Sequence, residues 1–343
     1  MDATRLISRY RSALMGFAQI WIVLMHCWLP VIPNRPILGG IESLVLSNGG
    51  LGVGMFLFLS GAGLTYSIRK GSLLSFYTGR LRRVLMPFWF MVIVYTIFQG
   101  HSFLWGLMRA TGYYAIAKNF LAFLWFIPAI IILYLFFPPY HALMMRAKSK
   151  TAFTGAALML WLFLTLLFHD HIRSDFWMLV NRIPLFMLGV WFGEAGREKP
   201  LEFRIEHWVL CFLSLLTGFL IIFADKRGLI PLRAPLSFVE SFLCCTSICF
   251  LLAGLFYILE NGRLSTVFRY PVRFLSFTGT FTLELYCIHQ WLYGKINPLL
   301  EGRVSYLTIN LISIPTLIAA GWLLHLVHMY FWKLIDRVRS KAK

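Results

Sequence analysis

Four ionisable side chains lie inside long apolar stretches of the sequence: His26, Arg182, Glu284 and His289. A histidine can act as a general base, a carboxylate can orient its ring, and an arginine can stabilise an oxyanion. The same groups could instead pair with one another to hold helices together, or relay protons across a membrane. The residue types by themselves leave these interpretations open.

The sequence around these groups is too apolar for a water-soluble protein. Of the 343 residues, 59% are hydrophobic and 13% are charged, whereas soluble domains carry about 25% charged residues. Apolar stretches of about 20 residues recur, each long enough to cross a bilayer core, and their all-round apolarity favours helices over barrel strands. We predict one all-α integral membrane domain over residues 1–343, with about ten transmembrane helices at 13–32, 49–68, 84–99, 119–138, 153–168, 176–193, 207–224, 238–259, 274–293 and 307–332.

The cations predict how these helices are oriented. With the N-terminus in the cytoplasm, most Lys and Arg residues fall in the inner segments, as the positive-inside rule requires. The C-terminus is then cytoplasmic too. The net charge of +18 is spread over short loops, which fits contact with anionic membrane lipids and argues against a nucleic-acid partner. We expect a multi-pass protein of the cell (inner) membrane.

In this topology the four ionisable groups lie at similar depths. His26 and Arg182 lie about six residues from the outer ends of their helices, His289 about four or five, and Glu284 about nine. Two further histidines, three positions apart in the last helix, have no carboxylate nearby in sequence and are interpreted as interfacial: His325 and His328. The six cysteines lack metal-ligand spacing, so no metal is expected.

Six strings of the sequence, in the expected order, resemble those of the acyltransferase-3 family of membrane acyltransferases. The first resembles the family's motif of an arginine, ten residues and a histidine, which ends here at His26. At the arginine position this chain has Met15, and Arg11 lies one helical turn earlier. The strings are LMGFAQIWIVLMH (Leu14–His26), GVGMFLFLSGAGL (Gly52–Leu64), FYTGRLRRVLMP (Phe76–Pro87), LWFIPAIIILYLFFP (Leu124–Pro138), RIPLFMLGVWFG (Arg182–Gly193) and GTFTLELYCIH (Gly279–His289).

The resemblance implies O-acyl transfer, typically of an acetyl group, from cytoplasmic acyl-CoA such as acetyl-CoA. The implied acceptor is a hydroxyl of an extracytoplasmic or lipid-linked glycan, as in polysaccharide modification. His26 would be the general base. On its depth alone Arg182 is the candidate oxyanion donor, and Glu284 either orients His26, pairs with a cation such as Arg182, or is protonated. Clustered cytoplasmic arginines would bind the phosphates of the donor, unless they only set the topology: Arg80, Arg82 and Arg83, with Arg11 as a further candidate.

Two other classes of protein compete with this interpretation. A transporter or flippase for a lipid-linked sugar or small solute would use the buried charges as a proton relay. A glycan polymerase or ligase would need large outer loops to hold its polymer, and the outer loops predicted here are short. A covalent acyl product distinguishes the transferase from the transporter.

Overall fold

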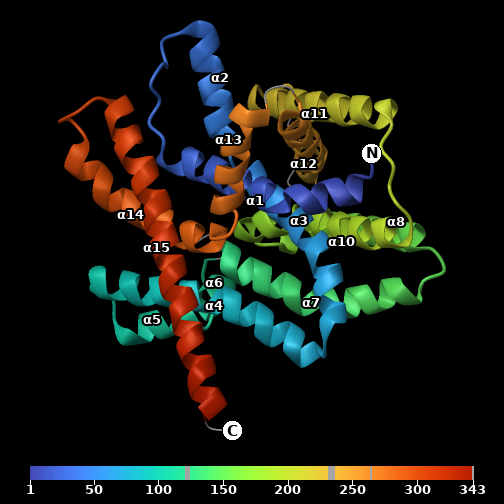
Figure 1. Cartoon of the computed structure of the whole chain (residues 1–343), viewed down its shortest axis with the longest axis horizontal. Helices are drawn as coiled ribbons and strands as arrows, with labels where there is room; N and C mark the ends of the chain where they lie inside the picture. The colour runs from blue at the N-terminus through green and yellow to red at the C-terminus, as the bar shows by residue number, and fades with distance from the viewer. Residues whose placement is uncertain (120–123, 231–235, 263–264, 342–343) are drawn as a thin grey trace. The chain divides into compact units, whose positions relative to one another are not determined.

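The computed structural model describes residues 1–119, 124–230, 236–262 and 265–341. These residues form helices and no β-strand (Figure 1), which confirms the all-α prediction. The elements are α1 (Ala3–Cys27), α2 (Pro36–Ser47), α3 (Leu51–Ser67), η1 (Ile68–Lys70), α4 (Leu73–Phe98), α5 (Phe103–Ala110), α6 (Tyr113–Ala117), α7 (Phe126–Arg146), α8 (Lys150–Leu167), η2 (His169–His171), η3 (Ser174–Phe176), α9 (Trp177–Val180), α10 (Ile183–Glu198), α11 (Ile205–Lys226), α12 (Phe238–Asn261), α13 (Ser265–Thr278), α14 (Thr282–Leu300) and α15 (Tyr306–Lys341).

Within the described ranges, eight helical segments are long and apolar enough to cross a membrane. Helices α1 and α14 are not among them, although the sequence predicts a span at each. Part of the predicted span 119–138, residues 120–123, lies outside the described residues. The eight segments are Leu51–Lys70, Leu73–Phe98, Phe126–Arg146, Lys150–Leu167, Ser174–Glu198, Ile205–Lys226, Phe238–Asn261 and Tyr306–Val338.

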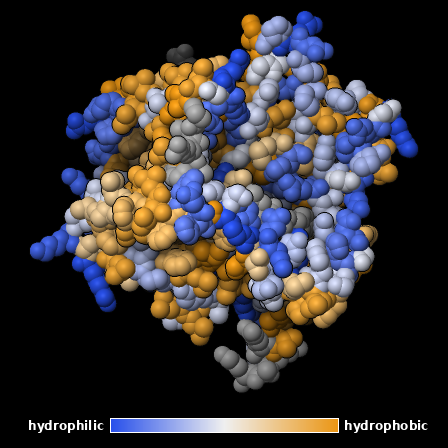
Figure 2. Space-filling model, turned by 180° about the vertical axis from the view of Figure 1, so that it is seen from behind, coloured by the Kyte–Doolittle hydropathy of each residue, from blue (hydrophilic) through white to orange (hydrophobic). Residues whose placement is uncertain are grey.

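Many hydrophobic side chains lie on the surface of the protein rather than in its interior. Figure 2 shows hydrophobic residues in orange over much of one face. Helix α11 is the clearest case, because only 11% of its most apolar 18-residue stretch is buried. A water-soluble protein rarely leaves such large apolar patches exposed. These faces therefore suit contact with lipid, as expected for a multi-pass membrane protein; exposed examples on α11 are Leu210, Phe212, Leu213, Leu216, Leu220 and Phe223.

The chain divides into two compact units. Unit 1 comprises Met1–Ala18, Leu51–Thr78 and Ala129–Phe277. Unit 2 comprises Gln19–Gly50, Gly79–Pro128 and Thr278–Lys343.

In unit 1, α3 and α10 pack closely through glycines. A Cβ atom built on Gly61 of α3 would lie 2.4 Å from the carbonyl oxygen of Phe186, and one on Gly189 of α10 would lie 2.1 Å from that of Phe58. Both distances are far below van der Waals contact. Small residues at these positions let two membrane helices approach backbone to backbone. The second and fifth strings named above thus pack against each other.

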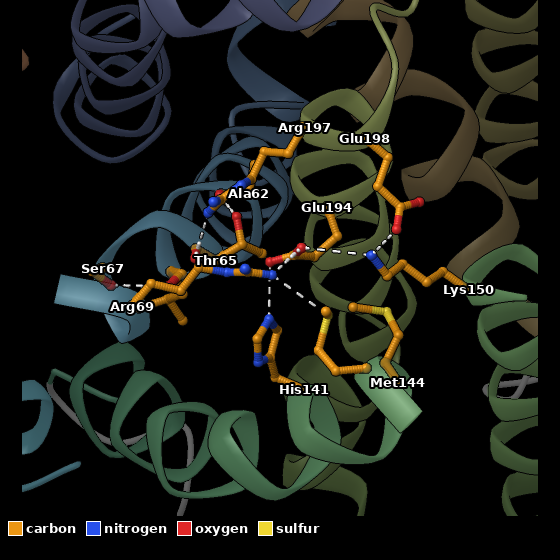
Figure 3. A network of polar contacts seen from close by, with 12 residues as sticks. Ala62, Thr65, Ser67, Arg69, His141, Met144, Lys150, Glu194, Arg197 and Glu198 are labelled. Atoms are coloured by element: carbon orange, nitrogen blue, oxygen red, sulfur yellow. Dashed lines mark hydrogen bonds and ion pairs between the residues drawn. The ribbon is translucent and has the colours of Figure 1, made fainter. Parts of the chain in front are cut away.

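A buried carboxylate joins four elements of unit 1 (Figure 3). Glu194 of α10 is 1% exposed. Its carboxylate oxygens lie 2.8 Å from Nη2 of Arg69, 2.9 Å from Nε2 of His141 and 3.9 Å from Nζ of Lys150. Lys150 also pairs with Glu198 one helical turn along α10. An apolar interior admits such a charge only when it is paired and hydrogen-bonded, and here η1, α7 and α8 each supply a partner.

In unit 2, α14 and α15 lie side by side (Figure 1, orange and red). At Gly321 of α15 an added Cβ would lie 2.9 Å from Cβ of Leu285, so the glycine permits the close approach. The last turns of α1 join this pair of helices through a small buried core. Its members are Val23, Cys27, Phe281, Leu285 and Leu317.

Candidate active site

His26 lies in the last turn of α1, and its side chain is exposed. The sequence places it about six residues inside a span of 13–32, and this is wrong because α1 ends at Cys27. Pro30 and Pro33 follow, and a proline disfavours the helical conformation of the residue before it. Within the described residues the His26 ring forms no hydrogen bond. Its nitrogens are therefore available to a substrate.

Two polar side chains from distant elements hold the segment that follows His26. Asn310 of α15 accepts a hydrogen bond from the backbone N–H of Leu29 at 2.9 Å and donates one to its carbonyl oxygen at 2.7 Å. Glu42 of α2 accepts from the indole of Trp28 at 3.0 Å and from two backbone N–H groups, those of Val31 and Ile32. Partial burial of Glu42 opposes its ionisation, but these hydrogen bonds lower its pKa below the usual range. The chain just beyond His26 is thus fixed.

Within unit 2, the His26 ring lies against that of His289 on α14. The two ring centroids are 5.4 Å apart, and His289 is 1% exposed. Its Nδ1 lies 2.8 Å from the carbonyl oxygen of Tyr286. A carbonyl oxygen only accepts, so Nδ1 carries the proton and Nε2 carries a lone pair. Nε2 of His289 is buried with no hydrogen-bond partner among the described residues. The pair therefore offers one accessible imidazole and one with a fixed tautomer.

The side-chain hydrogen bonds of Glu284 are made with histidines other than His26. It lies in the first turn of α14 rather than mid-helix, because the predicted span 274–293 is broken: α13 ends at Thr278 and α14 begins at Thr282. Oε1 of Glu284 lies 2.9 Å from Nδ1 of His325 and 2.7 Å from Nδ1 of His328. The two histidines, which have no carboxylate nearby in sequence, thus receive one from α14, 41 and 44 positions away in the chain.

Arg182 and Arg11 belong to unit 1, whereas His26 and Glu284 belong to unit 2. Arg182 is the N-cap of α10, and its Nη1 donates to the carbonyl oxygen of Met178 at 2.8 Å. The predicted span 176–193 is interrupted at this residue, and Pro184 follows in the first turn, where a missing N–H costs nothing. Arg11 donates from Nε to the carbonyl oxygen of Leu59 at 3.3 Å.

The three clustered arginines all lie on α4 in unit 2. Arg82 pairs with Asp336 of α15 at 3.2 Å, and its guanidinium lies 4.6 Å from the ring centroid of Trp332. Arg80 is half-buried, and Arg83 is exposed. Three positions separate Arg80 from Arg83, so these two share a helix face. Arg83 is thus the most accessible of the three to an anionic ligand.

Sequence reasoning missed two features of this site and one elsewhere. The pairing of His26 with His289, and of Glu284 with His325 and His328, joins positions far apart in the chain. Glu194 in unit 1 was also missed. The sequence indicates a special role for Glu194 only in one respect: it is an acidic residue close to a strongly apolar stretch.

Comparison with known proteins places the chain in a family. The family model for acyltransferase-3, an acyltransferase domain, matches residues 13–326. No curated protein and no solved structure matches the chain. The matched region contains the six strings identified in the sequence and the His26–His289 pair, and it ends within α15, between His325 and His328. The extent of this match shows that the protein belongs to the acyltransferase-3 family.

Proposed function

We propose that this protein transfers an acyl group, typically acetyl, from cytoplasmic acyl-CoA to a hydroxyl of an extracytoplasmic or lipid-linked glycan in the cell (inner) membrane. Membership of the acyltransferase-3 family supports membrane-bound acyl transfer to a hydroxyl. The observation that carries the proposal is the exposed His26 ring, 5.4 Å from the buried ring of His289 at a fixed helix end. The proposal keeps both chain termini in the cytoplasm, with α1 and α14 as additional spans.

In the proposed reaction His26 takes the proton of the acceptor hydroxyl while its oxygen attacks the thioester carbonyl carbon. The carbon–sulfur bond then breaks, and the departing CoA thiolate receives the proton from His26. The oxyanion that forms in between needs a hydrogen-bond donor, the role for which the sequence makes Arg182 the candidate. His289 acts as a positioning residue, because its ring packs against that of His26 and restricts the side-chain rotation of His26.

Acyl-transfer assays test this function directly. The purified protein in nanodiscs is incubated with isotope-labelled acetyl-CoA and a panel of glycans and lipid-linked sugars. We expect free CoA to be released in proportion to acylated acceptor, both measured by mass spectrometry. The transporter alternative predicts instead that sugar uptake into proteoliposomes follows a pH gradient with no acylated product, and that result would refute the transferase.

Arg80, Arg82 and Arg83 are proposed to bind the phosphates of the donor. Replacing all three with Gln is expected to raise KM for acyl-CoA by at least about tenfold, because each charge-assisted hydrogen bond contributes about 1.5–3 kcal/mol. The value of kcat should change less, since these contacts are remote from the reacting carbon. Steady-state kinetics at varied donor concentration measures both.

A triple Arg→Lys variant separates donor binding from membrane topology. It keeps every positive charge, so insertion should be normal, but it loses the planar fork that binds phosphate with two hydrogen bonds. We expect an intermediate KM for this variant and an unaltered KM for Lys148→Gln, a cation change on another segment. A donor KM that stays constant in the Gln variant would leave the three arginines as topology determinants only.

A further inference from the structure

A buried group of two histidines and one carboxylate lies between α14 and α15, within unit 2. His325 and His328 are three positions apart on α15, so both rings lie on one face of the helix. Glu284 reaches them from the first turn of the neighbouring helix. Glu284 and His328 are 4% and 5% exposed, and the side chain of His325 is 22% exposed. One potential ligand atom from each residue lies within 4.8 Å of the other two.

We propose that Glu284, His325 and His328 bind a divalent transition-metal ion, with Zn²⁺ as the best match. Two imidazole nitrogens and one carboxylate oxygen suit Zn²⁺, whereas Mg²⁺ and Ca²⁺ favour oxygen ligands throughout. Two histidines and a glutamate also form a known ligand set for zinc, with a fourth position left to water. The proposal concerns a site separate from the His26–His289 pair and does not depend on the proposed reaction.

The two carboxylate–imidazole distances in the cluster are within about half an ångström of those that a metal ion would impose. Tetrahedral ligands at about 2.0–2.1 Å from Zn²⁺ are about 3.3 Å from one another. Oε1 of Glu284 now lies 2.9 Å and 2.7 Å from the two Nδ1 atoms, as hydrogen-bonded groups do. Separating each pair by about half an ångström, through side-chain rotation, would make room for the ion.

Binding of a metal ion requires the protons on the two Nδ1 atoms to move. Each Nδ1 now donates to a carboxylate oxygen, so each carries a proton. A metal ion takes the lone pair of each Nδ1, and both protons leave, to Nε2 of the same ring or to solvent. The bound ion would tie α14 to α15 and so hold the helix that carries His289.

Metal binding can be measured on the full chain, purified in detergent without a polyhistidine tag. After chelator treatment and its removal, the protein is titrated with Zn²⁺ and, separately, with Co²⁺. We expect one Zn²⁺ per chain by elemental analysis, a rise in Tm, and the visible absorption of tetrahedral Co²⁺. Excess Mg²⁺ should not displace either ion. If the untreated and the titrated wild-type protein bind neither ion, the proposal is overturned and the cluster is a hydrogen-bonded clamp only.

Variants identify the ligands. His325→Ala is the preferred change, because this side chain is the most exposed of the three and its loss perturbs the core least. We expect a Zn²⁺ dissociation constant raised by at least about 10–100-fold and loss of the Co²⁺ spectrum. His169→Ala is the matched control, since it removes a more exposed histidine that also contacts a carboxylate, that of Asp170. Equal Zn²⁺ affinity in His325→Ala, Glu284→Gln and wild-type protein would overturn the assignment.

Discussion

Replacing His26 with Ala is expected to lower kcat for acyl transfer by about 10²–10⁴-fold, the range that a general base contributes. The physical reason is that the imidazole that contacts the His26 ring, that of His289, is only 1% exposed and cannot reach a substrate in its place. The variant should insert and fold normally, because His26 is exposed and its ring makes no hydrogen bond within the described residues. Acylated acceptor and free CoA are measured on protein matched for amount and Tm.

Chemical rescue makes this test specific for the base. His26→Gly opens a space at an exposed position, so added imidazole should restore part of the activity and do so more strongly at higher pH. His169→Ala, at an exposed histidine in unit 1, should keep full activity. Retention of more than a few per cent of activity by His26→Ala, without imidazole, would remove His26 from the mechanism.

Replacing Glu194 with Ala is expected to cost about 3 kcal/mol of the free energy of unfolding, the lower end of the range for breaking a buried ion pair. The change leaves Arg69, His141 and Lys150 without their common acceptor. The lower end applies because the Arg69 side chain is 40% exposed and can turn toward water. Reversible denaturant titration in mixed micelles measures the free energy, and Tm in detergent gives an independent check.

Glu198→Gln is the matched control for this prediction. Its carboxylate pairs with the same Lys150, yet the side chain is 61% exposed. Exposed pairs contribute about 0–1 kcal/mol, so this variant should unfold close to wild type. If both variants lose the same small amount of stability, the Glu194 network does not stabilise unit 1.

Hydropathy alone accounts for most of the fold prediction. A backbone in lipid must satisfy its own hydrogen bonds, so a long apolar stretch has few alternatives to a helix. The approximate location of each helix is predicted better than the residues at which it begins and ends. The spans 176–193 and 274–293 each contain a break, at Arg182 and between α13 and α14. Hydropathy is averaged over a window of about 19 residues, so a break of two or three residues inside an apolar stretch does not lower it enough to be seen.

The sequence by itself determined that the protein is helical and membrane-embedded. It also identified four ionisable groups within apolar stretches that must be either paired or functional: His26, Arg182, Glu284 and His289. Their partners were decided only by tertiary structure. The partners of Glu284 lie 41 and 44 positions away on α15, and no local spacing reveals them. A buried charge must find a partner, but helix packing decides which one it finds. The fixed tautomer of His289 likewise depends on a backbone carbonyl, which every sequence contains and only a fold positions.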